Sequence, residues 1–282
     1  NVDLDDTTSV TIIKGSGSGT MTGGGAQSLV SGAQTWASLQ MDETGSFTLQ
    51  ASGGTLSAGV SASISAYPGP TTLAAGDIAI IGYNTDSTPD DIAILVVREL
   101  GPGTEFFVND NEVTSAGGAS FADLGEMEAS FTVKAGQTIP AGTVIILPWG
   151  AAAVSTTTFD WSSTSGAGLG NNAEEIYIYT AANISSLTPG AFIYGAEIGT
   201  GTGQRPSGLT AGTTWITPPP SGTAAASRYK IAGATYTATT NAMLTAIGDV
   251  ANNWETAASY TMADTDWTFT FVTPASEPTV QA

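Results

Sequence analysis

Short runs of β-branched and aromatic residues alternate with turn residues between positions 73 and 147, and this pattern constrains the fold more than any other feature. The runs are IAIIGY, IAILVV, EFFVND, ASFTVK and TVIIL, each five or six residues long. Gly, Pro, Asn and Asp punctuate the segments between them. Such spacing is typical of antiparallel strands joined by short connections. We therefore predict that residues 76–147 contain strands and loops and no helix longer than two turns.

The charge and composition narrow the classes of partner and chemistry. The chain has 282 residues, with 6 Lys and Arg against 25 Asp and Glu, for a net charge of -19. Such an acidic chain repels nucleic acids and anionic lipid surfaces. It contains neither Cys nor His, which removes thiolate chemistry and the commonest general base. No stretch approaches the roughly 20 apolar residues of a membrane span, so membrane insertion is not expected.

The first 25 residues alternate in polarity and then become rich in glycine. The apolar side chains fall at even positions: Val2, Leu4, Val10 and Ile12. Asp, Ser and Thr occupy the odd positions between them, which predicts an extended strand with one apolar face. Residues 15–25 read GSGSGTMTGGG, a composition typical of flexible linkers. Residues 1–25 are therefore predicted to form an N-terminal strand followed by a linker.

The remaining chain is predicted to form one all-β domain over residues 26–272, with a tail over 273–282. Tyr67-Pro68-Gly69-Pro70 is the best candidate for an internal boundary. However, the Ala- and Ser-rich strands before it bury little by themselves, so we expect them to pack onto residues 71–272.

One short helix is predicted over residues 239–254. Its spacing of apolar residues at four, three and four gives one helical face, made by Met243, Ile247, Val250 and Trp254. Thr239 or Thr240 is suited to cap its start. We expect this helix to cap an antiparallel sandwich of the immunoglobulin-like or jelly-roll-like kind.

Three motifs carry a resemblance to a known family: GDIAIIGYN at 76–84, DDIAILVVRELGPGTEFFVNDNE at 90–112 and AGQTIPAGTVIIL at 135–147. Together they resemble a domain of exported bacterial proteins that is similar to lamin-tail-type immunoglobulin-like sandwiches. The resemblance extends over about residues 71–270 and implies a β-sandwich. It implies no catalytic residue. Where the family has an aromatic anchor in a DNGW turn, this chain has Asp110-Asn111-Glu112-Val113.

Two loops carry oxygen ligands of the kind that calcium prefers. One contains Asn109, Asp110 and Asn111, and the other contains Asp86, Asp90 and Asp91. Neither has the spacing of an EF-hand, and Asx residues in such turns also serve the backbone through hydrogen bonds. No cofactor is therefore predicted, with calcium as the alternative.

Two carboxylate pairs and several aromatic residues are the other candidates for chemistry. Glu126 with Glu128, and Glu174 with Glu175, have the residue types of a glycosidase pair. The aromatic residues that lie in or near predicted loops are candidates to stack on sugars: Tyr83, Trp149, Trp161 and Trp215. Acidic residues on strand surfaces and aromatic residues in cores are common, so we do not expect an enzyme.

These features together favour an extracellular structural protein of the cell surface that assembles with copies of itself. In this hypothesis Val2, Leu4, Val10 and Ile12 form a strand that a neighbouring subunit accepts into an apolar groove, because strand addition satisfies backbone groups on both partners. Repetition of such a contact gives a filament or a layer. The alternative is an adhesin-like module that binds glycans or calcium. A strand that folds back onto its own sheet would give no assembly.

Overall fold

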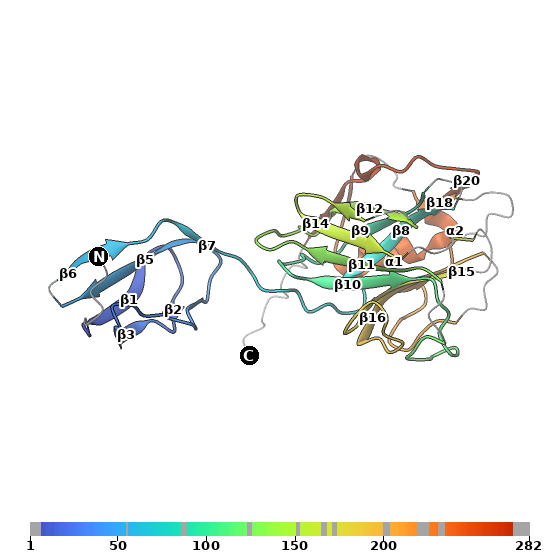
Figure 1. Ribbon diagram of the computed structural model, residues 1–282. Helices are drawn as coiled ribbons and strands as arrows, with labels where there is room; N and C mark the ends of the chain where they lie inside the picture. Colours follow the sequence, from blue (N-terminus) through green and yellow to red (C-terminus); the bar gives the residue numbers. More distant parts are fainter. Residues whose placement is uncertain are drawn as a thin grey trace, which may run out of the picture. The chain divides into compact units, whose positions relative to one another are not determined.

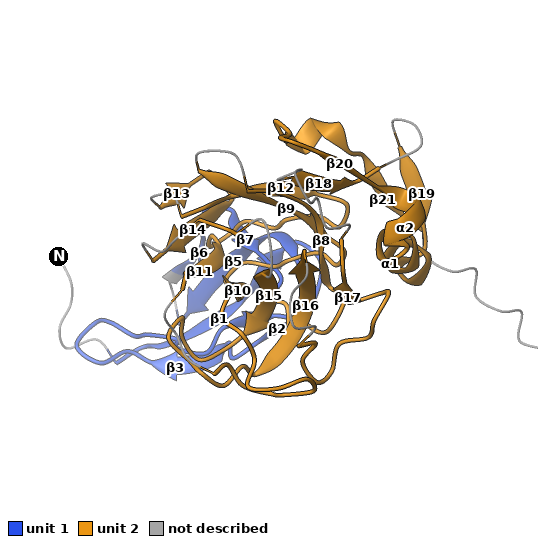
Figure 2. Ribbon diagram, turned by 90° about the vertical axis from the view of Figure 1, so that its right-hand side faces the viewer, with its two compact units in different colours: residues 1–69 blue, residues 70–282 orange. Residues whose placement is uncertain are grey.

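The structure is a computed structural model that describes residues 7–54, 56–85, 89–122, 126–150, 153–164, 168–170, 174–199, 204–218, 226–230 and 235–272. The chain separates into two compact units, residues 1–69 and 70–282 (Figure 2). This boundary falls inside the Tyr67–Pro70 segment, the candidate boundary in the sequence, and the strands before it lie in a compact unit of their own. The fold is all-β, as the sequence predicts.

Unit 1 is built around a five-stranded sheet in the order β3-β1-β5-β6, with β7 also paired to β5. A separate two-stranded pair joins β2 to β4. The strands of unit 1 are β1 Ser9–Ser16, β2 Met21–Thr22, β3 Gly25–Ser28, β4 Gln40–Met41, β5 Gly45–Gly53, β6 Leu56–Val60 and β7 Ile64–Ala66.

Residues 15–25 are not a free linker, because they connect two paired strands. β1 runs on to Ser16 and pairs with β3, with Ile12 opposite Gly25. The connection turns through Gly17 and Gly19, both at positive φ, and the Lys14 ammonium donates to both of their carbonyls. A glycine-rich composition therefore serves the tight turns here and not chain flexibility.

Unit 2 is a sandwich of a seven-stranded and a five-stranded sheet (Figure 1). The first sheet, in spatial order, is β13 Val154–Ser155, β14 Phe159–Ser163, β11 Glu128–Val133, β10 Glu105–Asn109, β15 Glu174–Thr180, β16 Ala191–Ile198 and β17 Trp215–Ile216. The second, also in spatial order, is β12 Val144–Trp149, β9 Asp90–Val96, β8 Ile78–Asn84, β18 Ala226–Tyr229 and β20 Trp254–Ala257. Within residues 76–147 the described part contains only strands and loops, as predicted.

Two hydrophobic cores hold unit 2 together. The main core combines side chains from both sheets, and Phe131 stacks between Phe106 and Phe159 at ring distances of 4.5 and 4.7 Å. A smaller core contains Phe107 and Tyr179, which share one face of the seven-stranded sheet. Covering both faces of this sheet explains why its strands carry apolar residues at consecutive positions and not only at alternate ones.

The predicted helix is shorter than the sequence pattern indicates. Helix α1 spans Thr240–Gly248, with Thr239 as its N-cap accepting from the Ala242 N–H, and a single turn, α2, follows at Val250–Asn253. Trp254 begins β20 instead of completing the helical face, because residues 254–257 pair with β18. Its indole still donates to the Ile247 carbonyl at 2.7 Å. Trp254 therefore contacts the helix through its side chain, as the helical spacing suggests, although its backbone belongs to a strand.

The C-terminal part of the described chain adds a short parallel pair, β19 Tyr236–Ala238 with β21 Phe269–Phe271, and a 3-10 turn, η1, at Asp264–Asp266. β16 and β17 are also parallel, whereas the other strand pairs are antiparallel. No helix in the described part of the chain has the length and apolar character needed to cross a membrane.

Candidate functional site

Three carboxylates from different parts of the sequence meet at one end of the seven-stranded sheet of unit 2. Asp110 directly follows β10, Glu126 precedes β11, and Glu174 begins β15. Because β10 lies between β11 and β15 and is antiparallel to both, its last residues meet the first residues of its neighbours. One oxygen from each carboxylate lies within 4.8 Å of the others. We call Asp110, Glu126 and Glu174 the acidic cluster.

Burial and mutual repulsion make the acidic cluster hard to ionise fully. Asp110 is only 4% exposed, and burial, followed by the charge of Glu126, raises its pKa to about 8. The Met127 N–H donates to Asp110 Oδ1 at 2.9 Å, which offsets part of this effect. Burial, followed again by the Glu126 charge, raises the pKa of Glu174 to about 7. At neutral pH the cluster therefore favours binding a proton or a cation.

The loop before β15 brings its backbone close to Glu174. A hydrogen bond from the Gly170 backbone partly lowers the Glu174 pKa. A Cβ atom on Gly170 would lie 2.2 Å from Glu174 Oε1, so a side chain at position 170 would displace the carboxylate. The position of this carboxylate thus depends on a glycine.

Of the three residues predicted to bind calcium in the first loop, only Asp110 joins the acidic cluster. The Asn109 amide donates to the Tyr179 hydroxyl at 3.2 Å. Asn111 donates to Glu128 Oε1 at 3.1 Å and accepts from the Glu126 N–H at 3.2 Å, so it joins the ends of two strands. These two asparagines bind protein groups, as Asx residues in turns commonly do.

The second predicted loop has no comparable cluster. Asp86 lies outside the described residues. Asp90 is buried and accepts from the Leu169 N–H at 2.7 Å, and Asp91 is a strand residue opposite Pro148. Among the described residues, the acidic cluster is the one group of three carboxylates close enough to share an ion.

The carboxylate pairs suggested by sequence are regrouped in space. Glu126 lies beside Glu174, whereas Glu128 bonds to Asn111 and accepts from the Thr164 hydroxyl at 3.1 Å. Sequence reasoning selected each of these acids but paired neighbours in the chain. The strand order β11-β10-β15 was the missing information, because it decides which strand ends meet.

The four aromatic residues considered for sugar stacking are all buried: Tyr83, Trp149, Trp161 and Trp215. Trp161 donates its indole N–H to the Pro148 carbonyl at 3.0 Å, and Trp215 stacks on Tyr177. All four are strand residues, in β8, β12, β14 and β17, and their rings fill the two cores. None of the four offers a ring face to a sugar in this structure.

Unit 1 presents a second feature, an apolar surface that its other strands leave incompletely buried. No residue of 7–54 or 57–69 is buried. Val10 and Ile12 share a sheet face with Phe47 and Leu49, because Ile12 lies opposite Ala51 and side chains two apart on a strand share a face. We call this the apolar face of unit 1.

A groove of about 570 Å³ runs beside that face. Its lining carries no charged side chain and consists of Met21, Leu39, Gln40, Met41, Phe47, Leu49, Ile64, Ser65, Ala66 and Tyr67. Val10 and Ile12 thus belong to a face of their own sheet, whereas Val2 and Leu4 lie outside the described residues. The alternation predicted this face but not that it would stay uncovered.

Comparisons with protein-family models, with curated proteins and with solved structures find no match for this chain. The resemblance to lamin-tail-type sandwiches therefore depends on the three sequence motifs quoted above. Function has to be argued from the acidic cluster and from the apolar face of unit 1.

Proposed function

We propose that this chain is an extracellular structural protein, without enzymatic activity, that assembles with copies of itself through unit 1. The observation that carries the proposal is the absence of any buried residue among residues 7–54 and 57–69. A sheet normally buries one face against a second layer. Unit 1 has an apolar face with only the two-stranded β2-β4 pair beside it, and none of the residues that define this face is buried, so a contact with another molecule is the natural way to cover it.

A second copy of the chain fits this surface better than a charged polymer does. The net charge of -19 repels nucleic acids and anionic membranes. The groove lining contains no charged side chain, so two grooves can approach without burying a charge. Lys14, opposite Leu49 on the same sheet face, donates to the Gly17 and Gly19 carbonyls. Each copy also carries the same surface, which makes repetition of the contact possible.

The fold limits which residues are free to act as a donated strand. Within one chain β1 pairs with β3 on one side and β5 on the other, so Val10 and Ile12 contribute to the apolar face of their own unit. The segment that precedes Ser9 contains the other two residues of the alternation, Val2 and Leu4. We propose that these earlier residues are the ones exchanged between subunits.

The test places a charge on the apolar face and compares it with the same charge on the opposite face. Phe47→Asp should abolish concentration-dependent assembly, measured by sedimentation velocity and negative-stain microscopy. Thr48→Asp, one residue along β5 and on the other face, should leave assembly intact. Assembly of the Phe47→Asp variant, or strictly monomeric wild-type protein at high concentration, would refute the proposal.

A calcium-dependent binding module of the cell surface is the second candidate, favoured by the acidic cluster. Three carboxylates within 4.8 Å, with raised pKa values at Asp110 and Glu174, form a site where a hard cation would relieve repulsion. Glycan binding has less support, since the four aromatic residues considered for it are buried. Isothermal titration with calcium separates this candidate from the first: saturable binding that Asp110→Asn removes supports it, and no heat of binding refutes it.

A further inference from the structure

The edge strand β12 differs from the other three sheet edges of unit 2. β13 and β17 have two residues each, and β20 has four and carries Glu255, which is paired with Arg228 at 2.8 Å. β12 has six residues, VIILPW, and no charge. Proteins usually protect sheet edges by shortness, charge, bulges or proline, because an open edge pairs with other strands. In the described part of the sandwich, β12 is the long uncharged edge.

Part of the β12 backbone faces away from the sheet and has no hydrogen-bond partner among the described residues. The Val96 N–H donates to the Thr143 carbonyl, and Val144 lies opposite Leu95. Because hydrogen-bonded pairs alternate along an antiparallel ladder, the backbone groups of Val144 and Ile146 point outward. No hydrogen bond reaches those groups from the described residues.

At Pro148, the next residue of β12 that faces outward, the edge cannot pair with an added strand. Pro148 has no N–H to offer, and its carbonyl accepts from the Trp161 indole at 3.0 Å. Trp161 belongs to β14 of the opposite sheet, so this bond joins the two sheets at one corner (Figure 1). The open part of the edge is therefore the stretch from Val144 to Ile146.

An apolar groove of about 490 Å³ lies along that open stretch. Its walls come from both sheets and from the segment at η1, and its lining is Ile139, Thr143, Val144, Ile145, Ile146, Thr156, Thr158, Phe159, Ala263 and Asp264. An edge with free backbone groups beside pockets for side chains is the combination that strand addition uses.

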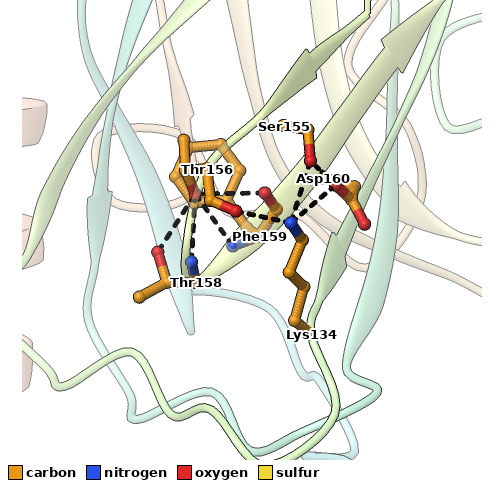
Figure 3. Close-up of polar contacts among 6 residues, drawn as sticks. All are labelled: Lys134, Ser155, Thr156, Thr158, Phe159 and Asp160. Atoms are coloured by element: carbon orange, nitrogen blue, oxygen red, sulfur yellow. Dashed lines mark hydrogen bonds and ion pairs between the residues drawn. The ribbon is translucent and has the colours of Figure 1, made fainter.

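One wall of the groove is held in place before anything binds. Thr156 Oγ1 accepts from the Thr158 and Phe159 N–H groups at 3.1 and 3.0 Å (Figure 3). Lys134 donates to the Thr156 carbonyl at 2.5 Å and forms an ion pair with Asp160 at 3.3 Å. A preformed wall reduces the entropy lost when a ligand docks.

From this edge and groove we infer that β12 accepts an extended strand, and that the strand is residues 1–6 of a second copy of this chain. The inference rests on the exchange of the earlier residues in the proposed function and places the surface that accepts them on unit 2, separate from the apolar face of unit 1. Residues 1–6 read NVDLDD and contain no proline, whereas residues 273–282 contain Pro274 and Pro278, which cannot donate to a ladder.

The alternation of residues 1–6 suits a strand that lies in this groove. Val2 and Leu4 are two positions apart, so they point to one side of the strand and can enter the apolar groove. Asp3 and Asp5 then point to solvent. The outward groups of Val144 and Ile146 are also two positions apart, so a strand of this length spans them. Since the donating segment and the accepting edge are different surfaces, repetition gives an open chain of subunits.

The first experiment measures the docking site itself, with a labelled synthetic peptide of residues 1–6 as the probe. The receptor is the full chain carrying Val2→Asp and Leu4→Asp, so that its own segment does not compete. We expect saturable binding by fluorescence anisotropy. Adding Ile146→Asp should weaken it at least tenfold, and adding Thr256→Asp on the exposed edge of β20 should not. Absence of binding, or equal binding to the Ile146→Asp variant, overturns the inference.

A second experiment distinguishes a second copy from the same copy. The chain has no cysteine, so each introduced thiol is unique. Chains with Leu4→Cys mixed with chains with Ile146→Cys should form disulfide-linked dimers, because the inference places Leu4 in the groove that Ile146 lines. A doubly substituted chain that forms only internal disulfides would show docking within one molecule and overturn the inference.

The outcomes separate this inference from the proposed function. Wild-type protein that assembles while the peptide fails to bind refutes the β12 site and leaves self-assembly standing. If the peptide binds at β12 but the wild-type protein stays monomeric, self-assembly is refuted and the β12 site is supported.

Discussion

Replacing Asp110 by Asn should remove most of the pH dependence that the acidic cluster gives to the stability of unit 2. Asn has nearly the shape of a protonated Asp and can still accept from the Met127 N–H through its amide oxygen. It cannot ionise, so the cost of a buried charge disappears. Glu174, whose pKa is about 7, continues to titrate in the variant.

The direction and the magnitude of this pH dependence follow from the ordinary pKa of Asp110 and its pKa in the folded chain. The folded-state pKa of Asp110 is about 8, against an ordinary value of 3.8. A raised folded-state pKa gives stability that is complete below pH 4 and is lost as the pH rises towards 8. At about 1.4 kcal/mol for each pH unit, the loss at pH 9 reaches at most about 6 kcal/mol.

The assay is urea unfolding followed by tryptophan fluorescence from pH 4 to 9, with a chelator present to remove divalent cations. The variant and the wild type should have similar free energies of unfolding at pH 4, and the variant should be more stable at pH 9. Asp160→Asn is the control, because Asp160 is exposed and its pKa is lowered, first by the Ser155 hydroxyl. A wild-type profile that is flat between pH 5 and 8, or identical in Asp110→Asn, would contradict the assigned burial.

Three further predictions concern the same unit. Calcium at pH 8 should raise the free energy of unfolding of the wild type by about 2.7 kcal/mol at 100 times Kd if the cluster binds it, and should not affect Asp110→Asn; an increase retained in the variant would place the ion elsewhere. Gly248→Ala should lower the free energy of unfolding by about 1–3 kcal/mol, because the added Cβ would lie 1.8 Å from the Gly212 carbonyl oxygen; an unchanged urea midpoint would contradict this packing. Trp161→Phe should cost about 1 kcal/mol or more by the same assay, since it leaves the Pro148 carbonyl without its donor.

The strands of unit 2 were predictable because local pattern determines them. The runs between residues 76 and 147 form β8 to β12 where their β-branched residues lie. The start of α1 was equally local, since the Thr239 hydroxyl caps it. The end of the predicted helix was not, because α1 stops at Gly248 and Trp254 belongs to a strand whose pairing with Tyr229 depends on the tertiary fold. The helical spacing of apolar residues up to Trp254 did not show that Trp254 begins a strand.

The candidate sites show the same division. Asp110 was identified from residue type in a turn, but its partners Glu126 and Glu174 could be grouped only once the order of the strands was known. The aromatic residues considered for sugar stacking were placed in or near loops, whereas they lie in strands and fill the cores, which the sequence had offered as their other role. The alternation in residues 2–12 gave the direction of an apolar face, whereas whether a second layer covers it is a property of the whole unit.

The lack of buried residues in the described part of unit 1 has a consequence for the order in which the two units become stable. A sheet without a core opens easily, so its amide hydrogens should exchange with solvent long before those of the sandwich, and a protease should cut it first. If copies supply the missing layer, its stability rises with protein concentration through mass action. Dilute chains would then carry a weakly folded unit 1 beside a stable unit 2, and only crowded chains would complete both. If the chain assembles as proposed, the folded fraction of unit 1 would increase with the local concentration of the protein.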